Sequence, residues 1–242
     1  MSPHPAASFG RTNYWARPME ADRTRRVLTL LVASSVVALG VLALRFGLTG
    51  STRFGFLVWN MFLAWMPLFV ALLLPRVARS TAVGGVLLGF AWLMLWPNAP
   101  YIVTDVVHLQ HPGTMPWWFD AMLVALFATI ALVVGLVSLH VVHRVATAHL
   151  GAAAGWIIVA LSLPLGAIGV YIGRVHRFNS WDVLVDPMGI VRTLLSDPSG
   201  AYSLRAMLIS ISVMSVCLAA GYAVTWRALT DASPSPKVST TE

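Results

Sequence analysis

Side chains capable of acid–base, metal or anion chemistry concentrate in two short stretches of the sequence. The first, Trp96–Gln110, reads WPNAPYIVTDVVHLQ and carries Asn98, Asp105 and His108. Asp105, His108 and His111 recur every three residues, and side chains at that spacing share one face of a helix. A carboxylate beside imidazoles can transfer protons or hold a metal, which makes Asp105 and His108 the catalytic candidates. The alternative is a structural turn in which these side chains only hydrogen bond to each other.

The second stretch, Gly173–Asp182, reads GRVHRFNSWD and is rich in arginine and amide groups. Guanidinium groups match the oxygens of a phosphate, so Arg174 and Arg177 predict an anion site such as a lipid headgroup. The alternative is an internal ion pair, for instance between Arg174 and Asp105. The predicted ligand-binding residues are Asn98, Arg174, Arg177, Asn179 and Asp182.

The elements that must position these residues are membrane helices. Hydrophobic residues make up 58% of the 242 positions and charged residues only 10%, whereas soluble domains are about one quarter charged. Six apolar segments approach the roughly 20 residues that a spanning helix needs. They cover Val27–Leu44, Gly55–Leu74, Ala82–Trp96, Phe119–Val142, Gly155–Gly173 and Leu204–Trp226. The sequence therefore predicts an all-α integral membrane protein with six transmembrane helices plus short interfacial helices.

The two polar stretches follow the third and fifth apolar segments, so they lie on the same side of the membrane in either orientation. Pro97 and Pro100 cannot donate backbone hydrogen bonds, and they predict that the third helix stops or kinks there. Residues from Tyr101 onward are expected to form a short helix lying in the membrane interface, and the segment after Asp186 a second one.

The chain divides into three parts by composition. Residues 1–26 form a polar, basic segment, residues 27–226 the membrane domain, and residues 227–242 a short tail expected to be disordered. In the six-helix arrangement, the side with both termini carries ten Lys and Arg residues and the other side six. Because cytoplasmic loops retain the positive excess, both termini are predicted to be cytoplasmic.

Other polar residues have simpler interpretations. Asp120 is expected to cap the fourth helix, and His140, His143 and His149 to be solvated at its other end. No charged residue lies in the middle of a predicted span, which argues against an ion-coupled transporter. Arginines scattered at segment ends argue against a nucleic-acid partner despite the net charge of +7. No metal or cofactor is predicted.

The two polar stretches together resemble a family of uncharacterised bacterial polytopic membrane proteins, the domain of unknown function 1361. The motifs that carry the resemblance are Pro97–Ile102, Thr104–Asp105, His108–Leu109, Gly173–Arg174, Arg177 and Asn179–Asp182. The resemblance covers roughly residues 30 to 226 and implies a location in the bacterial inner membrane. It implies no activity and no site residues, because none is established for the family.

The working hypothesis is a membrane protein that binds a lipid headgroup or another anionic envelope component at an outer-face polar site. One alternative is a membrane-embedded enzyme that uses Asp105 and His108. A second is a small-solute transporter, and a third a structural membrane subunit. The expected partner is membrane lipid, with a homo-oligomer or another membrane protein also open.

Overall fold

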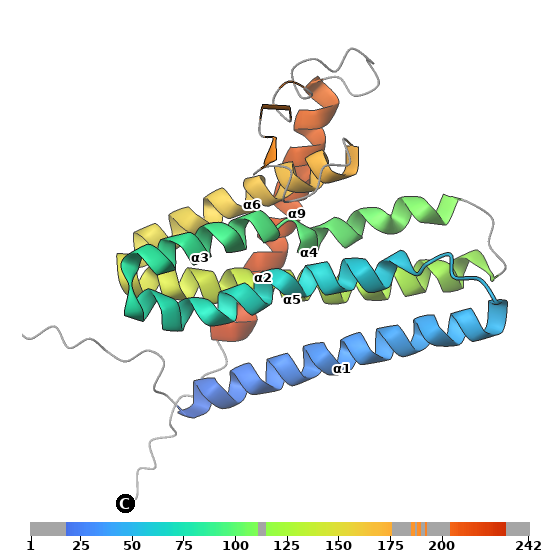
Figure 1. Cartoon of the computed structure of the whole chain (residues 1–242), viewed down its shortest axis with the longest axis horizontal. Coiled ribbons are helices and arrows are strands. Elements are labelled where there is room, and N and C mark those ends of the chain that lie inside the picture. The colour runs from blue at the N-terminus through green and yellow to red at the C-terminus, as the bar shows by residue number, and fades with distance from the viewer. Residues whose placement is uncertain are drawn as a thin grey trace, which may run out of the picture.

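A computed structural model describes residues 18–110, 115–175, 185–186, 188–189, 192 and 204–230. These residues fold into helices only (Figure 1). The helices are α1 (Pro18–Thr49), α2 (Phe56–Ser80), α3 (Ala82–Leu95), α4 (Asn98–Tyr101), the 3₁₀-helix η1 (Ile102–Gln110), α5 (Trp117–Leu150), α6 (Ala152–Val175) and α9 (Leu204–Thr230). Six spans are long and apolar enough to cross a membrane, which confirms the predicted fold class.

The third span is longer than predicted because the chain continues past its two prolines. Helix α3 ends at Leu95, α4 begins at Asn98, and η1 follows without a gap, so the apolar span runs over Ala82–Leu109. Figure 1 shows α4 and η1 extending onward in the same general direction as α3. The predicted break at Pro97 is confirmed, and the short helix predicted from Tyr101 onward is present as the end of α4 and η1. Its placement in the membrane interface stays a prediction. The apolar residues Ile102, Val103, Val106, Val107 and Leu109 make this continuation possible.

Helix α5 lies at the centre of the bundle. It contacts α1, α2, α4, α6, α9 and η1, and most of its length is buried on one or more sides. Apolar residues all around a helix are typical of one that is enclosed by others. Short connections hold the neighbouring helices antiparallel. Thr81 separates α2 from α3 and accepts a hydrogen bond from the Gly84 amide, and Gly151, with a φ of 91°, joins α5 to α6.

Glycines on α5 and α6 bring the broken part of the third span into close packing. A Cβ atom at Gly135 would lie 2.5 Å from the Cβ of Ala99. Cβ atoms at Gly166 and Gly169 would overlap with the Trp96 indole and the Pro97 ring. The indole Nε1 of Trp96 donates to the Ser162 carbonyl of α6 over 2.9 Å. The break is therefore held in place by complementary surfaces on two other helices.

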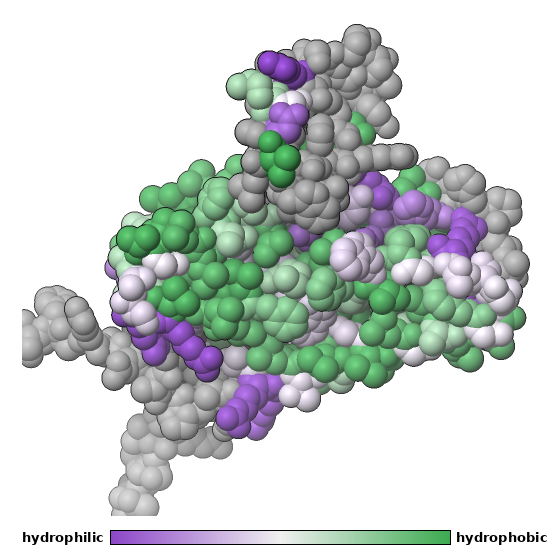
Figure 2. Space-filling model, in the orientation of Figure 1, coloured by the Kyte–Doolittle hydropathy of each residue, from purple (hydrophilic) through white to green (hydrophobic). Residues whose placement is uncertain are grey.

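The first and last helices lie at the periphery. Helix α1 packs mainly on α5, and α9 runs across α5 and α6 at a steep angle (Figure 1). Figure 2 shows a broad hydrophobic zone with hydrophilic side chains toward the two ends of the bundle and above η1. We call the end with the last residues of α1, η1 and α6 the outer end and the opposite one the inner end, and these names refer only to the two ends of the bundle. The predicted boundary between residues 26 and 27 falls inside α1.

Candidate functional site

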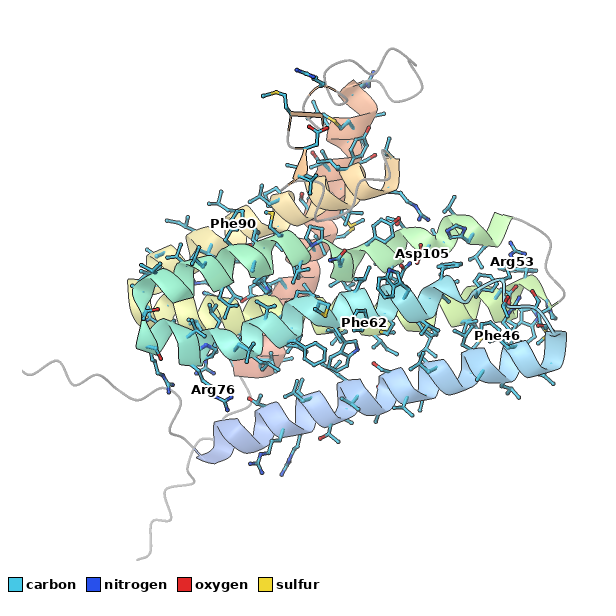
Figure 3. The ribbon with its side chains drawn as sticks, viewed as in Figure 1. Phe46, Arg53, Phe62, Arg76, Phe90 and Asp105 are labelled. Carbon is cyan, nitrogen blue, oxygen red and sulfur yellow. The ribbon has the colours of Figure 1, made fainter. Side chains whose placement is uncertain are left out.

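The Asp105 carboxylate is the centre of a polar network between three helical segments at the outer end (Figure 3). Asp105 lies in η1 and is 1% exposed. Its Oδ2 accepts a hydrogen bond from Asn60 Nδ2 of α2 over 2.8 Å, and its Oδ1 accepts one from Arg174 Nη1 of α6 over 3.2 Å. The amide and the guanidinium donor thus give each of the two oxygens of the buried carboxylate a hydrogen bond. The two polar stretches predicted to meet therefore do so through Asp105 and Arg174.

The Arg174 guanidinium is held from several directions. Its Nη2 donates to the Thr104 carbonyl over 2.5 Å, and Nη1 also reaches the Tyr101 hydroxyl at 3.4 Å. The guanidinium carbon lies 5.5 Å from the centre of the Tyr101 ring, within the range of cation–π attraction. The side chain nevertheless remains 23% exposed. These contacts fix its orientation while part of the group stays accessible.

His108 lies beside the carboxylate but is oriented mainly by other contacts. Its Nε2 is 3.9 Å from Asp105 Oδ1, which is too long for a hydrogen bond, and its side chain is 46% exposed. The imidazole packs on the Phe56 ring with 4.6 Å between centroids. Arg53 Nη2 donates to the His108 backbone carbonyl over 2.8 Å. The predicted shared face of Asp105 and His108 is present, with the carboxylate pointing inward and the imidazole outward.

Asn60 is the network residue that the sequence reasoning missed. It lies in the first turns of α2, within the apolar run FLVWNMFLAWM. A lone amide among apolar residues in a membrane span requires a hydrogen-bond partner. That signal was available, but nothing in the sequence identifies Asp105 as the partner.

A second buried ion pair joins α1 to α5 at the same end. Arg45 Nε donates to Asp120 Oδ1 over 2.7 Å and Nη2 to Oδ2 over 3.2 Å, and both residues are buried. The Phe54 ring lies 4.6 Å from the guanidinium carbon. The prediction that Asp120 caps its helix is wrong, because α5 begins after Pro116 without a side-chain cap and the carboxylate faces Arg45. Arg45 lies in the last turns of α1, so it is a charged residue near the end of a span and not in its middle.

The inner end carries a third polar contact. His143 Nδ1 lies 2.6 Å from the Tyr222 hydroxyl and links α5 to α9, and the Trp156 ring packs 4.5 Å from the imidazole. His140 and His143 are both buried, so the prediction that they are solvated is wrong. His149 is exposed as predicted. The error arose because α5 continues to Leu150, so that both residues lie about two to three turns before its end, and because α9 packs beside His143.

The other predicted site residues are only partly accounted for. Asn98 is the first residue of α4, one turn before Ile102. Arg177, Asn179, Asp182 and His111 lie outside the described residues, as does most of the predicted surface helix after Asp186. Within the described part of the chain, no three His, Cys, Asp or Glu side chains converge on a point where a metal would bind.

Comparison with known families gives one match. The model of a family described as "Protein of unknown function (DUF1361)" matches residues 59–218. No curated protein and no solved structure matches the chain. The match includes Asn60, Asp105, Asp120 and Arg174, whereas α1 with Arg45 lies before it. It covers well over half of the 242 residues. The chain therefore belongs to the DUF1361 family, and it has the six apolar helices of a multi-pass membrane protein.

Proposed function

We propose that this protein binds an anionic phosphate group, carried by a lipid headgroup or another envelope component, at the outer end beside Arg174. The observation that carries the proposal is that the Arg174 guanidinium has a fixed orientation and is still partly exposed. It is oriented by Asp105, the Thr104 carbonyl and the Tyr101 ring, yet its side chain stays 23% exposed. A guanidinium with a fixed orientation binds a phosphate with little loss of side-chain entropy.

The depth of the network supports a headgroup as the ligand. Asn60, Asp105 and Arg174 all lie within about two turns of the outer ends of their helices. Trp117 and Trp118 are exposed at the same end, and tryptophans are typical of the level of lipid headgroups. Hydrophilic side chains also gather over η1 and the end of α6 (Figure 2). A phosphate at this level would meet Arg174 without entering the hydrocarbon.

The orientation in a bacterial inner membrane is part of the proposal. Arg76 and Arg79 lie at the inner end of α2, on the side of the N-terminus of α1. Basic residues on that side support a cytoplasmic location for both termini. The phosphate site would then face the outer leaflet.

Lipid retention after purification tests the proposal. Arg174→Gln combined with Arg177→Gln is expected to lower the amount of co-purifying anionic phospholipid at least about tenfold, since the loss of even one charge-assisted hydrogen bond weakens binding by ~1.5 kcal/mol or more. Arg205→Gln, which removes an exposed arginine in the first turn of α9, is the control and should retain the lipid. Nanodiscs of phosphatidylglycerol and of phosphatidylcholine, with and without inorganic phosphate, separate a lipid ligand from a free anion. Unchanged retention in a folded double variant contradicts the proposal.

A transporter is the second candidate, because the third span is interrupted at Pro97 and Pro100. Discontinuous helices are typical of transporter binding sites, although those lie near the middle of the membrane. Uptake of labelled phosphate into vesicles, above that of empty vesicles, would favour this candidate. The enzyme alternative would require Asp105 to leave Asn60 and Arg174 before acting as a base with His108.

A further inference from the structure

The helix η1 has an unusual winding for its length. It runs over nine residues, Ile102–Gln110, as a 3₁₀-helix, whereas runs beyond 3–4 residues are uncommon. A 3₁₀-helix rises ~2.0 Å per residue and turns 120°, while an α-helix rises ~1.5 Å and turns 100°. The same residues wound as an α-helix would be shorter and would present different side chains to each neighbour.

Three donors from outside η1 hold it at separate positions. Arg174 of α6 binds the Thr104 carbonyl and the Asp105 carboxylate, and Asn60 of α2 binds Asp105 from another side. Arg53, between α1 and α2, binds the His108 carbonyl. The donors thus come from α6, α2 and the connection before α2.

These contacts are compatible with only one winding. Thr104 and His108 are four residues apart, so a change from 3₁₀ to α would rotate one relative to the other by about 80°. Arg174 and Arg53 could not keep both carbonyls after that rotation. The 3.9 Å approach of His108 to Asp105 fits the eclipsed i and i+3 positions of a 3₁₀-helix. Arg174, whose side chain is 23% exposed, is the member of this set that the proposed phosphate would engage.

We propose that η1 is a two-state element that rewinds from a 3₁₀-helix to an α-helix when a phosphate group binds Arg174. This inference rests on the proposed function and supplies its regulation. A phosphate on the guanidinium competes with the Thr104 carbonyl and with Asp105, which removes one of the three donors that hold η1. The prolines at 97 and 100 separate η1 from α3, so the change is confined to the outer part of the span. Binding at the surface thereby rotates Asp105 and shortens η1.

Spin labels on the third span measure the winding directly. Val83→Cys in α3 and Val107→Cys in η1, both exposed, are labelled in a Cys217→Ser background. Rewinding from Ile102 to Val107 shortens the distance between them by about 2–3 Å and turns the second label by about 100°. Phosphatidylglycerol nanodiscs are compared with phosphatidylcholine nanodiscs, each with and without inorganic phosphate.

Variants make the test independent of the ligand. Arg174→Gln is expected to shift the distance without any anion, and Asp105→Asn to shift it in the same direction, whereas Arg205→Gln should not. If Arg174→Gln and Asp105→Asn fold and keep the wild-type distance, the two-state inference is overturned. If phosphatidylglycerol is retained but the distance stays constant, the rewinding is overturned while the proposed function stands. If the variants shift the distance but no anion binds, the proposed function fails and ligand control of η1 is overturned with it.

Discussion

The guanidinium of Arg174 and the carboxylate of Asp105 meet at 3.2 Å although 69 positions separate them in the chain. Their contact ties the outer part of the third span to the end of the fifth. Because Asp105 is buried and Arg174 is partly exposed, the first depends on the second for its counter-charge. Removal of Arg174 therefore leaves a buried carboxylate without its counter-charge, whereas removal of Asp105 leaves a guanidinium that is partly exposed.

Removing Arg174 is expected to destabilise the protein more than removing Asn60. Arg174→Gln leaves the Asp105 carboxylate buried beside one amide donor, which costs about 3–5 kcal/mol for an unpaired buried charge. Asn60→Leu removes one neutral donor and should cost about 1–3 kcal/mol. Unfolding in detergent gives the free energy of unfolding of each variant, in the wild-type background and in the Asp105→Asn background. The cost of Arg174→Gln should be smaller in the Asp105→Asn background, because the buried charge is then absent. Equal costs in both backgrounds would show that the two side chains are not coupled.

The Arg45–Asp120 pair is expected to be essential for docking α1. Arg45→Gln leaves the Asp120 carboxylate buried without its bidentate partner and should destabilise the protein by about 3–5 kcal/mol. Arg25→Gln, at an exposed position near the inner end of α1, is the control and should change little. Protease sensitivity of the loop between α1 and α2 reports whether α1 has separated. A resistant Arg45→Gln protein would show that apolar contacts alone hold α1.

Glycine substitutions test the close packing of the broken span. Gly166→Ala and Gly169→Ala introduce Cβ atoms that overlap with Trp96 and Pro97, and overpacking of this kind costs about 1–3 kcal/mol. Gly89→Ala in α3 is the matched control because nothing lies within 4 Å of its added Cβ. It should be neutral or slightly stabilising, as alanine favours helix. Thermal unfolding of the three variants gives the order of their stabilities directly.

The His143–Tyr222 contact is expected to contribute modestly to the attachment of α9. Tyr222→Phe keeps the ring packing against Trp156 and removes the hydroxyl, so the loss should be about 0.5–2 kcal/mol. His143→Phe in the same background should add little further loss if the bond is the main polar interaction of either group. Cross-linking between α5 and α9 follows the separation of the helices. A loss above about 4 kcal/mol would indicate a larger role than one hydrogen bond supplies.

Labelling of introduced cysteines tests the orientation. Trp117→Cys at the outer end and Ser80→Cys at the inner end are both exposed, in a Cys217→Ser background. In intact cells, a membrane-impermeant maleimide should modify position 117 and not position 80. The reverse pattern would invert the proposed topology, and the relative placement of Asp105 and Arg174 would remain valid.

The sequence predicted the fold class because long apolar runs are a local property of the chain. The pairing of Asp105 with Arg174 was also within reach, since both follow helices that end on one side. The features that could not be predicted are those that depend on residues distant in the sequence. The packing of the broken part of the third span depends on the glycines of α5 and α6, and the burial of Arg45 and His143 depends on helices that arrive later. Asp120 has the position of a helix cap, and only the placement of α1 reveals its true partner.

The separation of Arg45 and Asp120 along the chain also has a consequence for biosynthesis. Asp120 is synthesised 75 residues after Arg45, which at ~5–20 residues per second corresponds to a delay of about 4–15 s. During that time the Asp120 carboxylate is absent, and a guanidinium without its counter-charge is costly in hydrocarbon. Helix α1 can reach its final depth only after the fourth span has entered the membrane. The first helix to be made is thus among the last to be fixed in place.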